Sequence, residues 1–113
     1  MHILFDYGHG GKEPGATYKG RHEANDVLRL GQAIAKRLRT AGLQIDETRT
    51  TNSTLSLQQR VEMEKRKKYD FFISFHRNAF KPEVGTGAEI FVFSLTNPQS
   101  KSKPLADKIQ SAL

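Results

Sequence analysis

The chain has 113 residues, no cysteine, and a formal net charge of +6 with an isoelectric point near 9.8. A length of this order suits a single domain. Without cysteine there can be no disulfides, thiolate zinc sites or cysteine nucleophiles, so histidine and carboxylate side chains would have to hold any metal. The positive charge favours an anionic partner, such as nucleic acid or an anionic cell-wall polymer.

The order of predicted elements is typical of an α/β fold with a mostly parallel or mixed central sheet flanked by helices. Apolar residues every second position indicate strands, and apolar residues every third or fourth position indicate helices. In chain order the pattern predicts a strand at 2–7, a helix at 25–41, a strand at 43–49, a helix at 56–68, strands at 70–76 and 88–94, and a helix at about 103–113. The run at 70–76 is dense enough in aromatic and β-branched residues to predict a buried central strand.

The last predicted helix runs into Leu113 without a capping residue or a following strand. We therefore expect residues 1–113 to form one domain whose fold is truncated before its last strand and helix.

Two histidines follow predicted strands. His9 lies just past the first strand, and His76 lies at the end of the third. Right-handed crossovers make these strands parallel, so both imidazoles should emerge at the same carboxyl edge, where α/β sheets bind ligands. Side-chain alternation further places Ser74, His76 and Asn78 on one face of the third strand.

Two imidazoles alone do not complete a zinc site, which needs a third nitrogen or oxygen ligand. Glu23, just before the predicted first helix, and His22 beside it are both suitably placed. Because neighbouring side chains in an extended segment point in opposite directions, at most one of the two should face the site. The residues themselves leave this choice open.

The glycine-rich stretch GHGGKEPG, residues 8–15, could instead cradle a phosphate. It lacks both G-x-G-x-x-G and G-x-x-x-x-G-K-[ST], and its proline is followed by further loop instead of a helix N-terminus. The phosphate-binding interpretation is therefore weak.

Five stretches of the chain, in order, resemble the zinc-dependent N-acetylmuramoyl-L-alanine amidases of bacterial autolysins and phage endolysins. GHGGKEPGA resembles the family's opening His-Gly-Gly loop, and GRHEANDVLRLGQAIAKRL its glutamate-bearing segment and helix. TRTTNSTLSLQQRV resembles its Thr-Arg strand end and Leu-x-x-Arg helix. SFHRNAF resembles its Ser-x-His-x-Asn-Ala strand end, and GTGAEIFVFS its next strand. The resemblance covers nearly the whole chain.

The resemblance implies that His9, Glu23 and His76 bind Zn²⁺, with the fourth position open for water. It implies hydrolysis of the amide between the lactyl group of N-acetylmuramic acid and L-alanine in peptidoglycan. Ser74 and Asn78 would order the site. Arg77 departs from the family pattern, which commonly has a small residue there; it would either bind a carboxylate of the stem peptide or lie exposed to solvent.

The family also uses a catalytic glutamate on a late strand, and this sequence has no glutamate after Glu89. We therefore expect the general acid/base to lie beyond Leu113, and no catalytic residue of this kind is assigned within the chain. The alternatives are a metal-binding amidase-like domain with impaired catalysis, or another zinc peptidase or deacetylase.

Arg49 and Arg60 are expected to make structural ion pairs or hydrogen bonds.

The expected partner is peptidoglycan, with no nucleic acid, no membrane insertion and a monomeric state. No signal peptide and no membrane-spanning run are visible. We therefore expect synthesis in the cytoplasm and action at the bacterial cell wall, as the resemblance to endolysins implies. A non-enzymatic binder of cell wall or nucleic acid is the remaining alternative.

Overall fold

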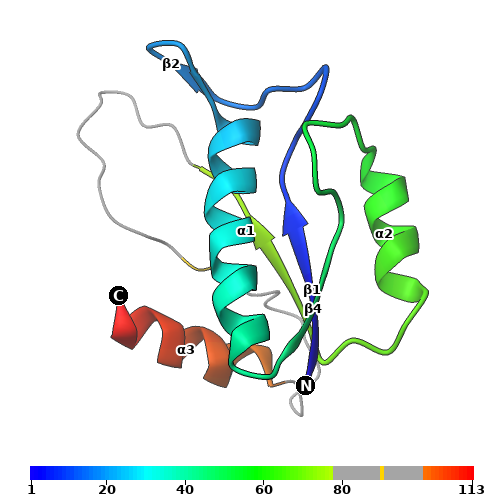
Figure 1. The fold of residues 1–113 in the computed structure, drawn as a ribbon, viewed down its shortest axis with the longest axis vertical. Helices are drawn as coiled ribbons and strands as arrows, with labels where there is room; N and C mark the ends of the chain where they lie inside the picture. The colour runs from blue at the N-terminus through cyan, green and yellow to red at the C-terminus, as the bar shows by residue number, and fades with distance from the viewer. Residues whose placement is uncertain (78–89, 91–100) are drawn as a thin grey trace. The chain divides into compact units, whose positions relative to one another are not determined.

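The computed structural model describes residues 1–77, 90 and 101–113. The chain divides into two compact units, Met1–Ala79 and Phe80–Leu113. The first unit contains β1 (His2–Tyr7), β2 (Thr17–Tyr18), β3 (Arg21–His22), α1 (Glu23–Thr40), β4 (Gln44–Glu47), α2 (Leu57–Lys65) and β5 (Phe71–Phe75), as Figure 1 shows. The second contains α3 (Ser102–Ala112).

The central sheet of the first unit is parallel, with strand order β4-β1-β5. In its register Tyr7 lies opposite Phe75, so β1 and β5 end side by side. The predicted α/β architecture is confirmed, and its consequence for function is that the segments after β1 and β5 leave the sheet at the same edge.

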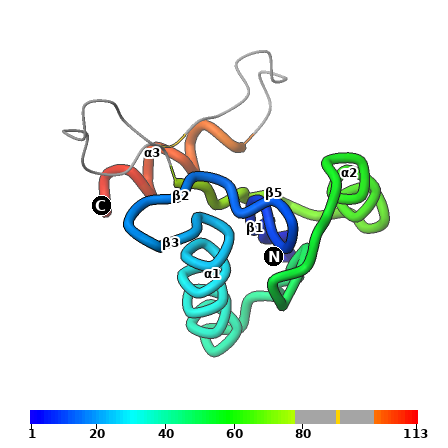
Figure 2. The backbone as a smooth tube through the Cα atoms, turned by 90° about the horizontal axis from the view of Figure 1, so that it is seen from above, coloured from blue at the N-terminus to red at the C-terminus, as the bar shows by residue number. Residues whose placement is uncertain are grey.

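Helices α1 and α2 lie on opposite faces of this sheet, as Figure 2 shows when the sheet is viewed from above. Ile3, Phe5 and Tyr7 of β1 join a buried core cluster with Val27 and Ala35 of α1. On the other face of β1, Asp6 bonds Arg60 of α2. The period-two alternation of β1 therefore sends apolar side chains to one helix and a carboxylate to the other.

Several element boundaries differ from prediction. Helix α1 begins at Glu23, so this residue belongs to the helix and not to the loop before it. Helix α2 is shorter than predicted, but the capping box of Ser56 and Gln59 is confirmed. The side chains of strand β5 alternate between half-buried and exposed, so this strand is less buried than expected, and β1 is the central strand among the described residues.

The predicted strand at 88–94 lies outside the described residues except for Ile90, which has no regular secondary structure. Helix α3 matches its prediction within one residue at each end. None of the described helices is both long and apolar enough to cross a membrane.

The sequence pattern gave no sign of the short hairpin of β2 and β3, because each strand has only two residues. Lys19 and Gly20, in the turn between them, both have positive φ angles, of 49° and 79°. The hairpin leads directly into α1 and thereby places Arg21 and His22 next to the helix start.

The ring of Tyr7 determines how closely α1 approaches the sheet. Tyr7 is fully buried, and its hydroxyl donates a hydrogen bond to Oε2 of Glu47 at 2.8 Å. Burial, together with the neighbouring Glu47 carboxylate, raises the pKa of Tyr7 and keeps the phenol neutral. A Cβ atom on Gly31 of α1 would lie 1.9 Å from Cε1 of this ring, so only glycine fits there.

Gly31→Ala should therefore destabilise the protein. Alanine adds about 1 kcal/mol of helix propensity, but overpacking against a ring that has no room to move costs about 1–3 kcal/mol. Urea unfolding would measure the change, with Lys36→Ala on the exposed side of α1 as the matched control. In a Tyr7→Ala background, Gly31→Ala should instead stabilise the protein, because the ring that it would clash with is gone. A Gly31→Ala protein at least as stable as the parent would contradict this account.

Candidate metal centre

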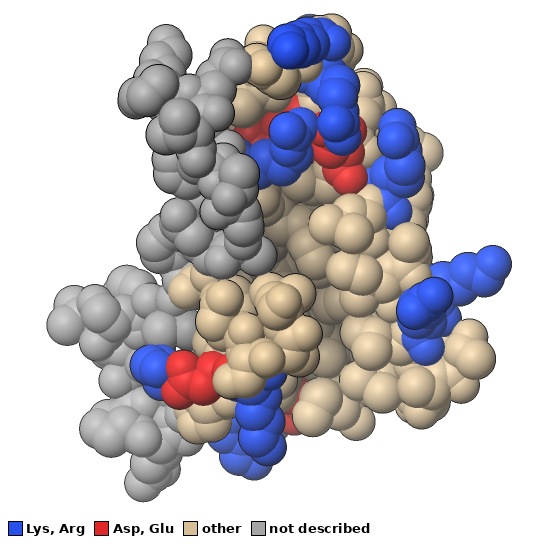
Figure 3. All heavy atoms as spheres, turned by 90° about the vertical axis from the view of Figure 1, so that its left-hand side faces the viewer, with Lys and Arg blue, Asp and Glu red and all other residues tan. Residues whose placement is uncertain are grey.

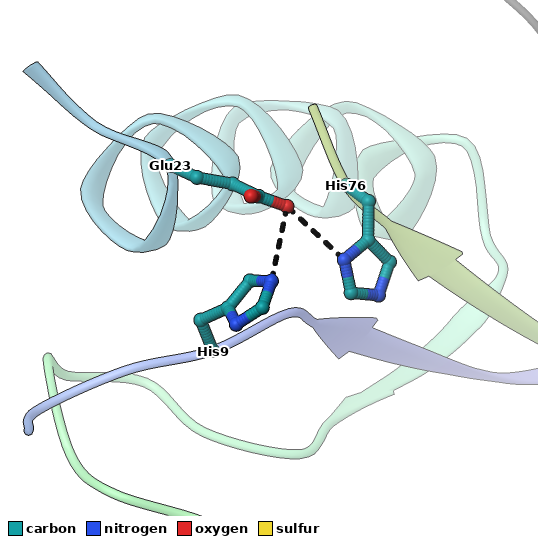
Figure 4. A group of neighbouring side chains, drawn as sticks. All are labelled: His9, Glu23 and His76. Atoms are coloured by element: carbon teal, nitrogen blue, oxygen red, sulfur yellow. Dashed lines mark hydrogen bonds and ion pairs between the residues drawn. The ribbon is translucent and has the colours of Figure 1, made fainter. Parts of the chain in front are cut away.

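Three side chains from three separate segments of the chain meet at the carboxyl edge of the sheet. Figure 4 shows His9, Glu23 and His76 pointing toward one another. Oε2 of Glu23 lies 3.3 Å from Nε2 of His9 and 3.1 Å from Nδ1 of His76. One potential ligand atom from each residue lies within 4.8 Å of the other two. The expected convergence of the two imidazoles and the glutamate is therefore observed.

Glu23 is the buried member of the group, with its side chain 4% exposed. Oε1 accepts a hydrogen bond from the backbone N–H of Ala16, and Oε2 accepts one from the N–H of Arg77, both at 3.0 Å. Burial alone would raise the pKa of the carboxyl group, but these two hydrogen bonds and the adjacent His9 and His76 outweigh it. The pKa is lowered, and Glu23 stays ionised.

His9 adopts a left-handed backbone conformation with φ 62°, which non-glycine residues rarely do. Gly10 and Gly11 continue this turn with φ angles of 132° and 56°. The conformation costs on the order of 1–3 kcal/mol and persists only where its surroundings enforce it. The enforcement comes from hydrogen bonds to the loop backbone.

Two arginines hold the carbonyl groups that follow β1. Arg60 donates to the carbonyl oxygens of Tyr7 and His9 at 2.6 and 2.7 Å, and Nη1 also bonds Asp6 Oδ1 at 2.6 Å. Arg49 donates to the carbonyl oxygens of Tyr7 and Gly8 at 3.0 and 2.9 Å. Both arginines are buried. The expectation that they are hydrogen-bonding residues is confirmed, and their positions fix the loop that carries His9.

Two glycines leave the space that the three side chains occupy. A Cβ atom on Gly8 would lie 2.3–2.9 Å from three ring atoms of His76. A Cβ atom on Gly15 would lie 2.6 Å from the ring of His9 and 2.7 Å from Oε1 of Glu23. The glycine-rich stretch thus allows both a tight turn and a close approach of backbone to imidazole.

The cluster fits a metal ion by donor type and by spacing. Two imidazoles and one glutamate form a ligand set known from catalytic zinc sites. Two ligand atoms at zinc distance and tetrahedral angle are separated by about 3.3–3.4 Å. Oε2 of Glu23 lies 3.1 Å from Nδ1 of His76 and 3.3 Å from Nε2 of His9, close to this value.

The remaining candidate residues have other roles or places. His22 is exposed on β3 and does not join the cluster; it lines a separate cavity of about 300 Å³ with Lys12 and Asn52. Ser74 donates a hydrogen bond to Oδ2 of Asp6 at 2.6 Å and so ties β5 to β1. Arg77 pairs with Asp26. Asn78 lies outside the described residues.

Sequence reasoning missed Asp6 as a contributor to this site. Its side chain is 6% exposed in a strand that is otherwise mostly apolar and buried, and its carboxylate accepts hydrogen bonds from Thr48, Arg60 and Ser74. The available signal was an acidic residue within the predicted apolar strand HILFDY. A buried aspartate needs charged or hydrogen-bonding partners. The identity of those partners could not be read from the local sequence.

A parallel α/β sheet with two histidines and a glutamate at its carboxyl edge has the features of a metallohydrolase. The N-acetylmuramoyl-L-alanine amidase family model matches residues 3–113. The chain belongs to this family.

Curated relatives agree with the family match. The chain is 30% identical to the N-acetylmuramoyl-L-alanine amidase AmiC of Escherichia coli O6:H1, over 97% of this chain and 27% of AmiC. It is 31% identical to LytC of Bacillus subtilis, over 98% of this chain and 22% of LytC. The chain thus spans about a quarter of the length of these relatives.

Solved structures show the same fold. The CwlD amidase of Clostridioides difficile, solved in complex with the GerS lipoprotein, matches with a TM-score of 0.89 and 27% identity, covering 97% of this chain and 63% of CwlD. An N-acetylmuramoyl-L-alanine amidase of Clostridium difficile 630 matches with a TM-score of 0.83 and 28% identity, covering 97% of this chain and 60% of that one. The chain corresponds to part of these amidase structures.

Gly8→Ala should weaken metal binding with little effect on folding. The added methyl group displaces the ring of His76, which is half exposed and can move. Displacing a ligand in this way should reduce zinc affinity about 10–100-fold, measurable by competition with a chromophoric chelator. In a His76→Ala background, Gly8→Ala should change nothing further, because the nearest atoms all belong to His76. A Gly8→Ala protein with parental zinc affinity would refute the steric argument.

Arg60→Met should unfold the protein more easily than substitution of the exposed arginine that follows the same helix, Arg66. Removing one partner of a buried ion pair leaves the Asp6 carboxylate without its main counter-charge, at a cost of about 3–5 kcal/mol. Arg66→Met is the matched control and should change stability by less than about 0.5 kcal/mol. Adding Asp6→Asn to Arg60→Met should recover part of the loss. Equal urea midpoints for the two arginine variants would be incompatible with this role.

Proposed function

We propose that this chain is part of a zinc-dependent N-acetylmuramoyl-L-alanine amidase that hydrolyses peptidoglycan. The observation that supports the proposal is the convergence of His9, Glu23 and His76 in a member of this family. The expected bond is the amide between the lactyl group of N-acetylmuramic acid and L-alanine. The expected place of action is the bacterial cell wall, and the net charge of +6 suits its anionic polymers.

His9, Glu23 and His76 would hold the zinc ion. Bound zinc supplies a Lewis acid for the scissile carbonyl and acidifies an attacking water. The protein prepares this ligand set before the metal arrives. Glu23 is ionised at neutral pH, and His9 is held in a turned backbone conformation by Arg60. Little reorganisation is needed to bind the ion.

Proton transfer to the leaving amine requires an additional acid. We propose that the family's late-strand glutamate supplies it from beyond Leu113, in the remaining part of the amidase domain. Residues 1–113 would then provide the metal ligands of the site, and the rest of the domain would provide the acid. The rival proposal, a metal-binding domain with impaired catalysis, differs only in whether hydrolysis follows metal binding.

The first experiment tests zinc binding. The purified chain should bind one zinc ion. His9→Ala, Glu23→Gln or His76→Ala should each lower the zinc affinity at least about 100-fold, because only two protein ligands then remain to hold the ion against water and chelator. His22→Ala is the matched control and should bind zinc as the parent does. If His22→Ala loses zinc while His76→Ala keeps it, the ligand assignment is wrong.

The second experiment tests the reaction on purified peptidoglycan, with the chain extended by the remaining part of the amidase domain that we propose supplies the glutamate. An amidase creates new L-alanine amino groups, a deacetylase releases acetate, and a peptidase leaves the bond between lactyl group and alanine intact. New amino groups that disappear with 1,10-phenanthroline and return with zinc are the expected result. Zinc binding without new amino groups would instead support the impaired domain.

A further inference from the structure

A charged cluster lies directly beside the metal centre. Arg77 follows the ligand His76, and its guanidinium bonds Oδ2 of Asp26 through Nη1. Arg21 of β3 reaches the same oxygen through Nη2 at 3.3 Å. Asp26 lies three residues after Glu23 on α1, so both acids lie on the same side of the helix. Figure 3 shows the resulting mixture of basic and acidic side chains around β2, β3 and the start of α1.

The charges of this cluster do not cancel. Two guanidinium groups share one carboxylate, and Asp26 is the only acid within ion-pair distance of either group among the described residues. Arg21, Arg77 and Asp26 together therefore carry one excess positive charge. Each guanidinium offers five N–H donors in a planar fork, of which the contact with Asp26 uses only a part.

Exposure separates the two kinds of group. The Asp26 side chain is 12% exposed, whereas those of Arg77 and Arg21 are 40% and 63% exposed. The carboxylate is thus the inner member of the cluster, and the guanidinium groups are exposed to solvent. Ion pairs as exposed as these contribute little to stability. Holding two arginines at the rim is therefore better explained by binding than by folding.

We propose that Arg77 and Arg21 bind a carboxylate of the peptide attached to the scissile amide, and that Asp26 positions the two arginines. The inference rests on the proposed amidase function, because it places the peptide side of the substrate over this rim. Carboxylates accept two parallel hydrogen bonds from a guanidinium group, which gives orientation as well as affinity. The cluster would select anionic peptides over amidated ones.

The test uses two matched probes and the zinc-loaded chain. Both probes are N-acetylmuramoyl dipeptides, and they differ only in whether the second residue carries a free α-carboxylate or the corresponding carboxamide. Titration calorimetry or chemical-shift titration measures their affinities. The carboxylate probe should bind about tenfold more tightly, as expected for one added charge-assisted hydrogen-bonded pair.

Two substitutions should move this preference in opposite directions. Arg77→Gln should abolish it, because the fork and its charge are lost. Asp26→Asn should increase affinity for the carboxylate probe, because the competing negative charge is lost while the side chain keeps its shape. If the ion pairs were purely structural, both variants would be less stable than the parent, and neither would change the preference for the carboxylate probe. Arg37→Gln, in the last turn of α1, is the matched control.

The outcomes separate this inference from the proposed function. Zinc binding and amide hydrolysis with equal affinity for both probes would overturn the carboxylate site and leave the amidase proposal standing. A carboxylate preference that survives Arg77→Gln would also overturn it. Failure to bind zinc in the metal titration would instead reject the amidase proposal, whatever the two probes show.

Discussion

The ion pair between Asp6 and Arg60 is the interaction on which the candidate site depends. Asp6 is part of the central strand, and Arg60 comes from the helix on the opposite side of the sheet from α1. The carboxylate fixes the guanidinium, whose remaining N–H groups hold the carbonyl oxygens of Tyr7 and His9. Because a buried guanidinium must satisfy its donors, the backbone after β1 has few alternatives to the turn that presents His9.

This pair acts together with the parallel sheet. Tyr7 and Phe75 are register partners, and the N–H of Gly8 donates to the carbonyl oxygen of Phe75 at 3.1 Å. The chain after β1 therefore stays beside the end of β5, where His76 begins the next segment. Glu23 closes the group from the first residue of α1. The ends of β1 and β5 and the start of α1 thus place three candidate ligands within reach of one ion.

The parts of this arrangement that follow from periodicity could be predicted. Strand and helix positions, and the shared edge of His9 and His76, follow from local patterns and from the handedness of crossovers. The place of Glu23 within α1 could not, because the preceding two-residue strands carry no periodic signal. The partners of Asp6 could not be predicted either, since Arg60 and Ser74 lie 54 and 68 residues away. Family resemblance selected Glu23 over His22, a choice that alternation alone left open.

Net charge pointed to an anionic partner but did not distinguish a cell-wall polymer from nucleic acid. The arrangement of charges is more specific than their sum. Glu23 and Asp26 lie one turn apart on α1, yet Glu23 contacts the two imidazoles while Asp26 contacts two guanidinium groups. One carboxylate is suited to a cation and the other to arginines that retain donors for an anion. A substrate with a polarisable amide and a nearby carboxylate matches both, and a uniformly charged polymer backbone matches only the second.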